Sequence, residues 1–155
     1  MKKNHTSIPG FHDNLVRGIN FASEVGDFSS DISFDIDHIL EWVNCSPNHD
    51  EYLFSVSQAI LTFHYVSDLV MNISWGNSNY TKFTGDSSGF YILNIEKQKI
   101  NSPLGDPDYY SWKITTNNKG QMVSFGASNM SLKLIGSPKL VNRQYLLNSE
   151  RTNIY

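Results

Sequence analysis

Several histidines and aspartates of this chain have side chains whose types allow proton transfer. His12 and Asp13 are adjacent in a Phe-His-Asp motif, and His64 lies in a later apolar segment. An imidazole titrates near neutral pH and a carboxylate fixes its tautomer, so these groups would position a water molecule or a metal ion if the fold brought them together. One hypothesis is therefore a hydrolase that uses His12, Asp13 and His64. The interpretation that we favour is structural: His12 and Asp13 satisfy backbone groups where a strand begins.

Acidic residues form a second pattern. Asp35, Asp37 and Glu41 fall on one face of a predicted strand. Clustered carboxylates are the ligands that a hard cation such as Ca²⁺ needs. Residues two apart on a strand face are, however, about 6.5 to 7 Å apart, which is too far for easy chelation of one ion. We therefore expect a solvent-exposed acidic face that opposes edge-to-edge aggregation or meets a basic protein partner, and these three residues are the candidate binding residues.

Other sequence signatures of chemistry are absent. Cys45 is the single cysteine, so neither an internal disulfide nor a cysteine zinc cluster can form within the chain. The sequence contains no nucleophile elbow, phosphate loop, His-Glu-x-x-His motif or dinucleotide fingerprint. We therefore predict no metal and no cofactor, and we favour binding over catalysis. A third hypothesis is a small-ligand module in which aromatic rings on the surface stack against the ligand. The alternative interpretation is that the same rings pack in the core. These residues are Trp75, Tyr109, Tyr110 and Trp112.

The elements that must position these groups are predicted from period-two alternation, which dominates over helical spacing. Residues 14–21 and 31–43 are expected to form a hairpin. In the second of these strands, the face opposite the acidic residues is predicted to be buried and carries Ile32, Phe34, Ile36, Leu40 and Trp42. Further strands are expected at 52–65, 70–75, 90–95, 109–116, 121–127 and 130–135.

Local signals refine these strands. The alternation slips near Ser57-Gln58, which predicts a β-bulge. Asn117-Asn118-Lys119-Gly120 is the strongest hairpin signal, because Asn and Gly tolerate positive φ. Segment 90–95 is apolar on both sides and fits either a central strand or the start of a short helix. The tail from 143 to 155 is expected to contain one helical turn capped by Asn142.

Together these elements predict a mainly β fold. We expect an antiparallel sandwich or a curled, barrel-like sheet of about eight strands, with at most one short helix. An α+β arrangement is the alternative. The 155 residues fit a single domain, in which residues 1–10 and 150–155 are expected to be loosely ordered.

Composition excludes several classes of protein. The 12 basic and 15 acidic residues give a formal net charge of -3, which argues against nucleic-acid binding through phosphate neutralisation. Aromatic residues make up 13% of the chain and supply enough area for a packed core, so a wholly disordered chain is excluded. The sequence has no apolar run of about 18 residues and no apolar stretch after its N-terminal lysines. We therefore expect a cytoplasmic protein without a membrane span.

With these segments laid out, the chain resembles small uncharacterised bacterial domains that open with a Phe-His-Asp motif, here Phe11-His12-Asp13. Those domains continue through an acidic alternating strand that ends in Leu-Glu-Trp, here Leu40-Glu41-Trp42. The similarity continues in 61–69 and 112–127 and so covers most of the chain. A similar opening occurs in predicted immunity proteins of bacterial polymorphic toxin systems, where the match lies mainly within residues 1–70.

The resemblance implies neutralisation of a toxin and carries over no catalytic residues. The missing catalytic signatures and the acidic strand favour the same function. We therefore expect a cytoplasmic bacterial protein that acts without catalysis by binding another protein, as an immunity-type inhibitor does. The hydrolase and the small-ligand module are the alternatives.

Overall fold

The computed structural model describes residues 5–24, 26, 30–45, 47–48, 51–76, 89–102, 105 and 108–154. Within these residues the chain forms nine β-strands and one 3-10 turn and has no α-helix. The strands are β1 (Thr6–Ile8), β2 (Asn14–Ser23), β3 (Ser30–Asn44), β4 (Tyr52–His64), β5 (Ser67–Asn72), β6 (Phe90–Ile100), β7 (Tyr109–Thr116), β8 (Met122–Ala127) and β9 (Asn129–Val141). The 3-10 turn, η1, spans Asn148–Glu150.

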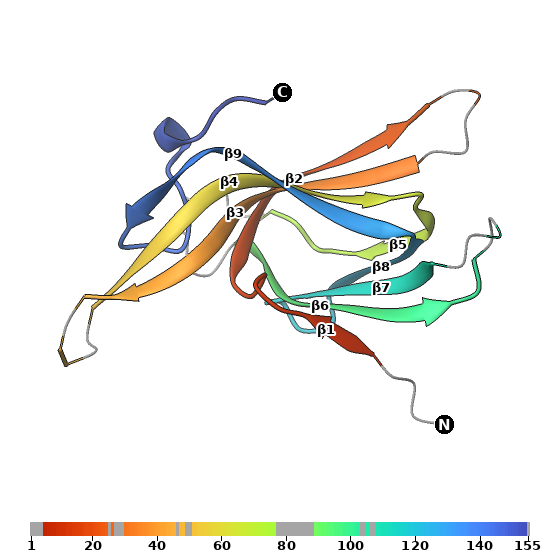
Figure 1. Ribbon diagram of the computed structural model, residues 1–155, viewed down its shortest axis with the longest axis horizontal. Helices are drawn as coiled ribbons and strands as arrows, with labels where there is room; N and C mark the ends of the chain where they lie inside the picture. The colour runs from red at the N-terminus through yellow and green to blue at the C-terminus, as the bar shows by residue number, and fades with distance from the viewer. Residues whose placement is uncertain are drawn as a thin grey trace.

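All of these strands belong to one antiparallel sheet. Its strand order is β5-β8-β7-β6-β2-β3-β4-β9, and β1 pairs with β6 beside this path. Figure 1 shows β3 and β4 along one side of the molecule and β6, β7 and β8 along the other, so the sheet bends over on itself. The sheet is not closed into a barrel. The predicted fold class, a mainly β curled antiparallel sheet, is confirmed.

The main core lies inside this bend, on what we call the inner face of the sheet. Phe63 of β4 packs edge to face against Trp112 of β7 and Phe125 of β8, with ring centroids 5.1 and 4.7 Å away. Such pairs each add about 0.5–1.5 kcal/mol beyond the area that they bury. These contacts therefore hold the two halves of the sheet together. On β3 the inner face carries, buried as predicted, Ile32, Phe34 and Ile36.

A bulge in β3 changes the face that its last residues occupy. β3 and β4 pair without interruption up to Ile39, but the next residue to pair is Glu41. Leu40 is therefore an extra residue, and Trp42 moves to the outer face. The sequence predicted that Leu40 and Trp42 would be buried on the face of Phe34. They are 43% and 52% exposed, so that prediction was wrong for both.

The slip predicted in β4 has a different cause from the one expected. Ser57 and Gln58 pair with consecutive residues of β3, so β4 is regular on that side. The irregularity lies in its pairing with β9, where the extra residues belong to β9. The alternation changes phase because β4 is buried first on its outer face, at Val56, and then on its inner face, at Ala59. The bulge was therefore predicted at the right level of the sheet but in the wrong strand.

The hairpins expected at 14–43 and at Asn117–Gly120 are both present, as β2 with β3 and β7 with β8. Segment 90–95 begins strand β6 and is not helical. β5 starts at Ser67, earlier than predicted, because the turn before it uses Tyr65 with a φ of 55°. In the tail, the 3-10 turn has Leu147 as its N-cap, so the predicted cap at Asn142 was wrong.

Parts of both terminal segments that we expected to be loosely ordered are attached to the sheet. Residues 6–8 form β1 and pair with β6. Near the other end, Arg151 and Thr152 form hydrogen bonds with β3 and β4. Residues 1–4 and 155 of these segments lie outside the described part of the chain.

The Leu40 bulge predicts unequal effects of two aromatic substitutions. Phe34→Ala removes a ring that is 0% exposed and should lower the free energy of unfolding by about 3–5 kcal/mol. Trp42→Ala removes a half-exposed ring and should cost less than about half of that amount, because less area is lost and water fills the space. Urea denaturation of both variants measures the difference. Equal costs would place Trp42 on the inner face and contradict the bulge.

Candidate functional site

The predicted acidic face is buried in its central part. Asp35 is 4% exposed and Asp37 is 0% exposed, whereas Glu41 is exposed. The expectation of a solvent-exposed acidic face was therefore wrong for two of its three residues. Alternation placed Asp35 and Asp37 correctly on the face opposite Phe34, but the C-terminal segment covers that outer face. Glu41 follows the Leu40 bulge and lies on the other face.

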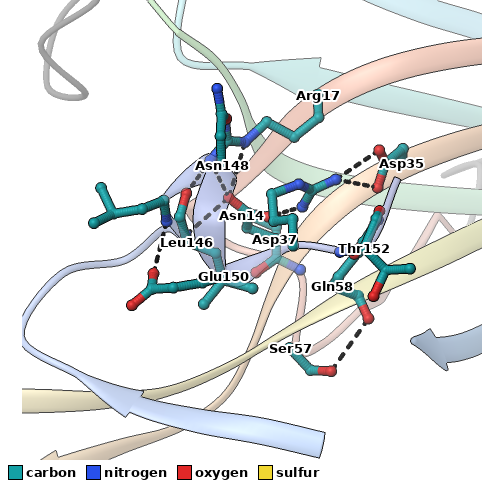
Figure 2. A network of polar contacts seen from close by, with 12 residues as sticks. Asn14, Arg17, Asp35, Asp37, Ser57, Gln58, Leu146, Asn148, Glu150 and Thr152 are labelled. Atoms are coloured by element: carbon teal, nitrogen blue, oxygen red, sulfur yellow. Dashed lines mark hydrogen bonds and ion pairs between the residues drawn. The ribbon is translucent and has the colours of Figure 1, made fainter. Parts of the chain in front are cut away.

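Two arginines, Arg17 and Arg151, neutralise the buried carboxylates. Figure 2 shows Arg17, Asp35 and Asp37 within this network of polar contacts. Arg17 Nε donates to Asp37 Oδ2 at 2.9 Å, and Arg151 Nη1 donates to Oδ1 of the same carboxylate. Arg151 Nη2 also donates to both oxygens of Asp35 at 2.6 Å. Arg17 is the extra residue of a bulge in β2, and a bulge redirects a side chain in this way. Both carboxylates therefore have the charged partners that burial requires.

The C-terminal segment, residues 142–154, is held on the outer face by the same group. The N–H of Leu146 donates to Asp37 Oδ2 at 3.0 Å. Gln58 exchanges two hydrogen bonds with the backbone of Thr152, at 3.0 and 2.8 Å. The side chain of Leu146 is buried in a second apolar cluster with Ile39, Phe54, Val56 and Val141. The segment thus covers the middle of β3 and β4.

The Phe-His-Asp motif lies at the start of β2. Asp13 has a φ of 64°, and its N–H is bonded to β6 at 2.8 Å. Its carboxylate lies 3.1 Å from His12 Nδ1 and accepts from Gln144 Nε2 at 3.4 Å. The side chain that satisfies a backbone group here is that of Asn14, whose Oδ1 accepts from the N–H of Ile39 at 3.1 Å. The backbone role predicted for His12 and Asp13 therefore belongs to the next residue.

A polar cavity of about 520 Å³ opens beside Asp13. Its lining residues are Asp13, Phe54, Tyr91, Asn117, Asn142, Arg143, Gln144 and Tyr145. Asp13 contributes a negative charge and Arg143 a positive one. Arg143 also hydrogen-bonds Glu150, and this bond lowers the pKa of Glu150. The cavity offers both charges, amide groups and aromatic rings to a polar group of a binding partner.

The three residues of the hydrolase hypothesis are not brought together. His12 and Asp13 lie at the start of β2, which pairs with β3 beside Asp37. His64 instead hydrogen-bonds Asp31. Asp37 is six positions further along β3 than Asp31, which corresponds to about 20 Å along the strand. A water molecule or metal ion therefore cannot contact all three groups at once.

His64 contacts two other side chains, those of Asp31 and Ser131. We call Asp31, His64 and Ser131 together the serine relay. His64 Nδ1 lies 3.0 Å from Asp31 Oδ2, and Nε2 lies 2.8 Å from Ser131 Oγ. Asp31 Oδ1 also accepts from the N–H of Tyr65 at 3.3 Å. The imidazole is thus held between a carboxylate and a hydroxyl group.

Three aromatic rings gather on the outer face toward the far end of the β3 and β4 hairpin. Trp42 packs edge to face against Phe54 and Tyr52, with ring centroids 5.0 and 6.2 Å away. Phe54 is buried in the second apolar cluster, but Trp42 and Tyr52 are 52% and 43% exposed. Figure 1 shows this end of the hairpin extending past the rest of the sheet. We call Trp42, Tyr52 and Phe54 the hairpin aromatic cluster.

The rings of the small-ligand hypothesis are mainly part of the core. Tyr109 and Trp112 are buried, so core packing is confirmed for these two. Tyr110 is half-buried, and the amine of Lys97 lies 4.5 Å from the centre of its ring. Trp75 is exposed. The four rings therefore do not form the exposed stacking platform that this hypothesis requires.

The partners of the candidate residues were not predicted from the sequence; they are Arg17, Arg151, Asp31 and Ser131. For Arg17 one signal existed. Val16 and Ile19 both contribute to the core on the inner face, and a spacing of three between them is incompatible with a regular strand. For the other three, contact depends on pairing between distant strands, which local alternation does not encode.

The buried ion pairs predict a large effect of removing one arginine. Arg151→Met keeps the length of the side chain but leaves Asp35 buried without its charged partner, so the free energy of unfolding should fall by about 3–5 kcal/mol. Lys99→Met is the matched control, because Lys99 pairs with Asp108 at the surface and should change stability by less than about 1 kcal/mol. Urea denaturation compares the two. A similar small effect for both would mean that the carboxylates are not held as buried charges.

His38 predicts a dependence of stability on pH. Its Nδ1 lies 2.8 Å from Asn14 Nδ2, and burial lowers the pKa of its imidazole below the ordinary value of 6.5. The unfolded chain therefore binds more protons than the folded chain as the pH falls below 6.5, and the folded state loses stability there. His38→Gln should lose less stability than the unmodified chain between about pH 7.5 and about pH 5.5.

The control for this measurement is His12→Gln, because His12 is exposed at 66% of its side chain. Denaturant unfolding at the two pH values gives the loss of stability for each variant. An equal loss in His38→Gln and the unmodified chain would contradict the assignment of this pH dependence to His38.

Comparison with known proteins identified no protein similar to this chain. No family model, curated protein or solved structure matches the chain significantly. Among the described residues, no group of three His, Cys, Asp or Glu side chains could hold a metal ion, and no helix is long and apolar enough to cross a membrane. The resemblance to immunity proteins stays a prediction, and any functional assignment depends on the residues described above.

Proposed function

We propose that this chain is a protein-binding domain and that the hairpin aromatic cluster is the anchor of its binding surface. The observation that carries the proposal is the exposure of Trp42 and Tyr52 on top of a buried ring, Phe54. Trp and Tyr are enriched among the residues that dominate interface energies. Rings already fixed by packing lose little conformational freedom on binding, so more of the free energy of burying them contributes to the affinity.

The size of the exposed rings agrees with an anchor. Half of one Trp and one Tyr side chain amounts to roughly 200 Å², which is equivalent to about 5 kcal/mol of transfer free energy when fully buried. An interface of ordinary size buries about 800 Å² on each partner, so neighbouring groups must contribute. The residues that line the polar cavity can supply part of this area, because Phe54 belongs both to the cavity wall and to the hairpin aromatic cluster.

The charges beside the cluster indicate the kind of partner. Glu41 of β3 and Glu51, the residue just before β4, are exposed at the same end of the hairpin as the cluster, with Glu41 on the inner face. Opposite charge on a partner increases the rate of association and orients it. A protein with a basic rim around an apolar depression fits this surface. Of the three candidate binding residues from the sequence, Glu41 alone is exposed; because it lies on the inner face, it would act on a partner through longer-range charge and not through contact beside the rings.

An immunity-type inhibitor is one protein that binds in this manner, and the resemblance of the Phe-His-Asp opening supports that assignment. The finer proposal is that the partner is a toxin whose activity the chain blocks. It predicts that the partner, expressed alone, stops bacterial growth and that co-expression of this chain restores growth. Trp42→Ala should then fail to restore growth.

The binding proposal is tested by quantitative capture from a lysate of the source cells. The chain, its Trp42→Ala variant and its Phe21→Ala variant are immobilised at equal density. Phe21 is the matched control, because it is also an exposed aromatic residue but lies in β2, away from the cluster. We expect at least one protein whose captured amount falls about tenfold or more with Trp42→Ala, equivalent to 1.4 kcal/mol, and stays constant with Phe21→Ala.

Two results would overturn the proposal. Equal capture by all three proteins would mean that the cluster is not the anchor. A dimer of the unmodified chain that becomes a monomer in Trp42→Ala, measured by light scattering, would mean that the cluster serves self-association. Thermal unfolding of the variants checks that each one is folded.

A further inference from the structure

We propose that Ser131 is a nucleophile toward acyl esters, activated by the serine relay. This goes beyond the proposed binding function and does not depend on it. The order of contacts is carboxylate to imidazole to hydroxyl, with Asp31 Oδ2 3.0 Å from His64 Nδ1 and His64 Nε2 2.8 Å from Ser131 Oγ. Serine hydrolases on unrelated folds use the same arrangement, which is recognised by geometry and not by sequence position.

The strands fix this arrangement. Asp31, His64 and Ser131 lie on β3, β4 and β9, which are neighbours in the sheet. His64 pairs with Asn129, so Ser131 is two residues further along β9 and projects from the same face as the imidazole. Side chains on rigid adjacent strands are held more precisely than side chains on loops.

The partners determine where the protons lie. An ionised carboxylate only accepts hydrogen bonds, so His64 Nδ1 carries a hydrogen and donates it to Asp31. Nε2 is then unprotonated and accepts the hydrogen bond of the Ser131 hydroxyl. This tautomer is the one in which an imidazole acts as a general base toward serine. Asp31 is itself positioned by the N–H of Tyr65, at 3.3 Å.

Groups that can stabilise an oxyanion lie beside Ser131. Thr62 pairs with Ser131 across the ladder, so the two side chains project from the same face. Thr62 Oγ1 lies 3.0 Å from Ser33 Oγ. When Ser33 donates in that contact, the Thr62 hydrogen is free to bond a developing negative charge. Lys133 is the next residue of β9 on this face and adds a positive charge.

The reaction is the hydrolysis of an ester by one water molecule. Ser131 Oγ attacks the carbonyl carbon while its proton moves to His64 Nε2. The bond from that carbon to the alkoxy oxygen breaks, and the leaving alcohol takes the proton from Nε2. Water then attacks the acyl-serine with His64 as base, releases the carboxylic acid and restores the Ser131 hydroxyl. Because Ser131 is exposed, the site suits short acyl chains on good leaving groups.

The experiment uses the full chain with p-nitrophenyl acetate and, separately, a fluorophosphonate probe that reacts with activated serines. We expect hydrolysis above the buffer rate and covalent labelling that maps by mass spectrometry to Ser131. Ser131→Ala should lower the hydrolysis rate about tenfold or more, and Asp31→Asn should also lower it. Ser137→Ala is the matched control, because Ser137 is an exposed serine of the same strand outside the relay. It should leave both readouts unchanged.

The two readouts separate the proposal from its simplest rival, direct attack by the His64 imidazole. In that case Ser131→Ala would keep the hydrolysis rate and no label would appear on Ser131, and the proposal would be overturned. Labelling of Ser131 in the unmodified chain needs no variant to fold, so it supports the proposal even if a substitution destabilises the sheet. Absence of both labelling and Ser131-dependent hydrolysis overturns it.

Discussion

The carboxylate of Asp37 is the point on which three distant parts of this chain depend. It is completely buried and receives hydrogen bonds from Arg17 of β2 and from Leu146 and Arg151 of the C-terminal segment. A buried carboxylate without such partners is several kcal/mol less favourable. The β2 bulge, the path of the C-terminal segment and the register of β3 must therefore form together. If one of these three features is lost, Asp37 lacks a hydrogen-bond donor, and the other two features are less stable in their native positions.

The long hairpin of β3 and β4 is buried on both faces only in its middle. The bent sheet covers the inner face through the rings around Phe63, while the C-terminal segment covers the outer face around Leu146. Neither cover reaches both ends of the hairpin. At one end the exposed outer face carries Trp42 and Tyr52, and toward the other it carries the serine relay. The two proposed activities thus occupy the parts of one face that the segment leaves open.

The strands were predictable from the sequence because alternation is local, and the fold class followed from their number and spacing. Burial of Asp35 was not predictable, because alternation is the same whether the polar face meets water or an arginine more than a hundred residues away. The Leu40 bulge left no signal, since Leu and Trp at 40 and 42 continue the alternation that the bulge interrupts. One member of the serine relay was singled out from the sequence. His64 was identified, but its partners Asp31 and Ser131 depend on the register of three strands.

The interaction that stabilises the fold also shapes the proposed binding surface. Phe54 packs in the same buried cluster as Leu146, and its ring supports Trp42 at 5.0 Å. The C-terminal segment that neutralises Asp37 therefore also fixes the floor on which the exposed rings rest. An anchor that is rigid before binding loses less entropy when a partner covers it. Loss of the ion pairs under the segment would consequently weaken the proposed binding even where no contact with the partner is removed, because the rings would no longer be held in place.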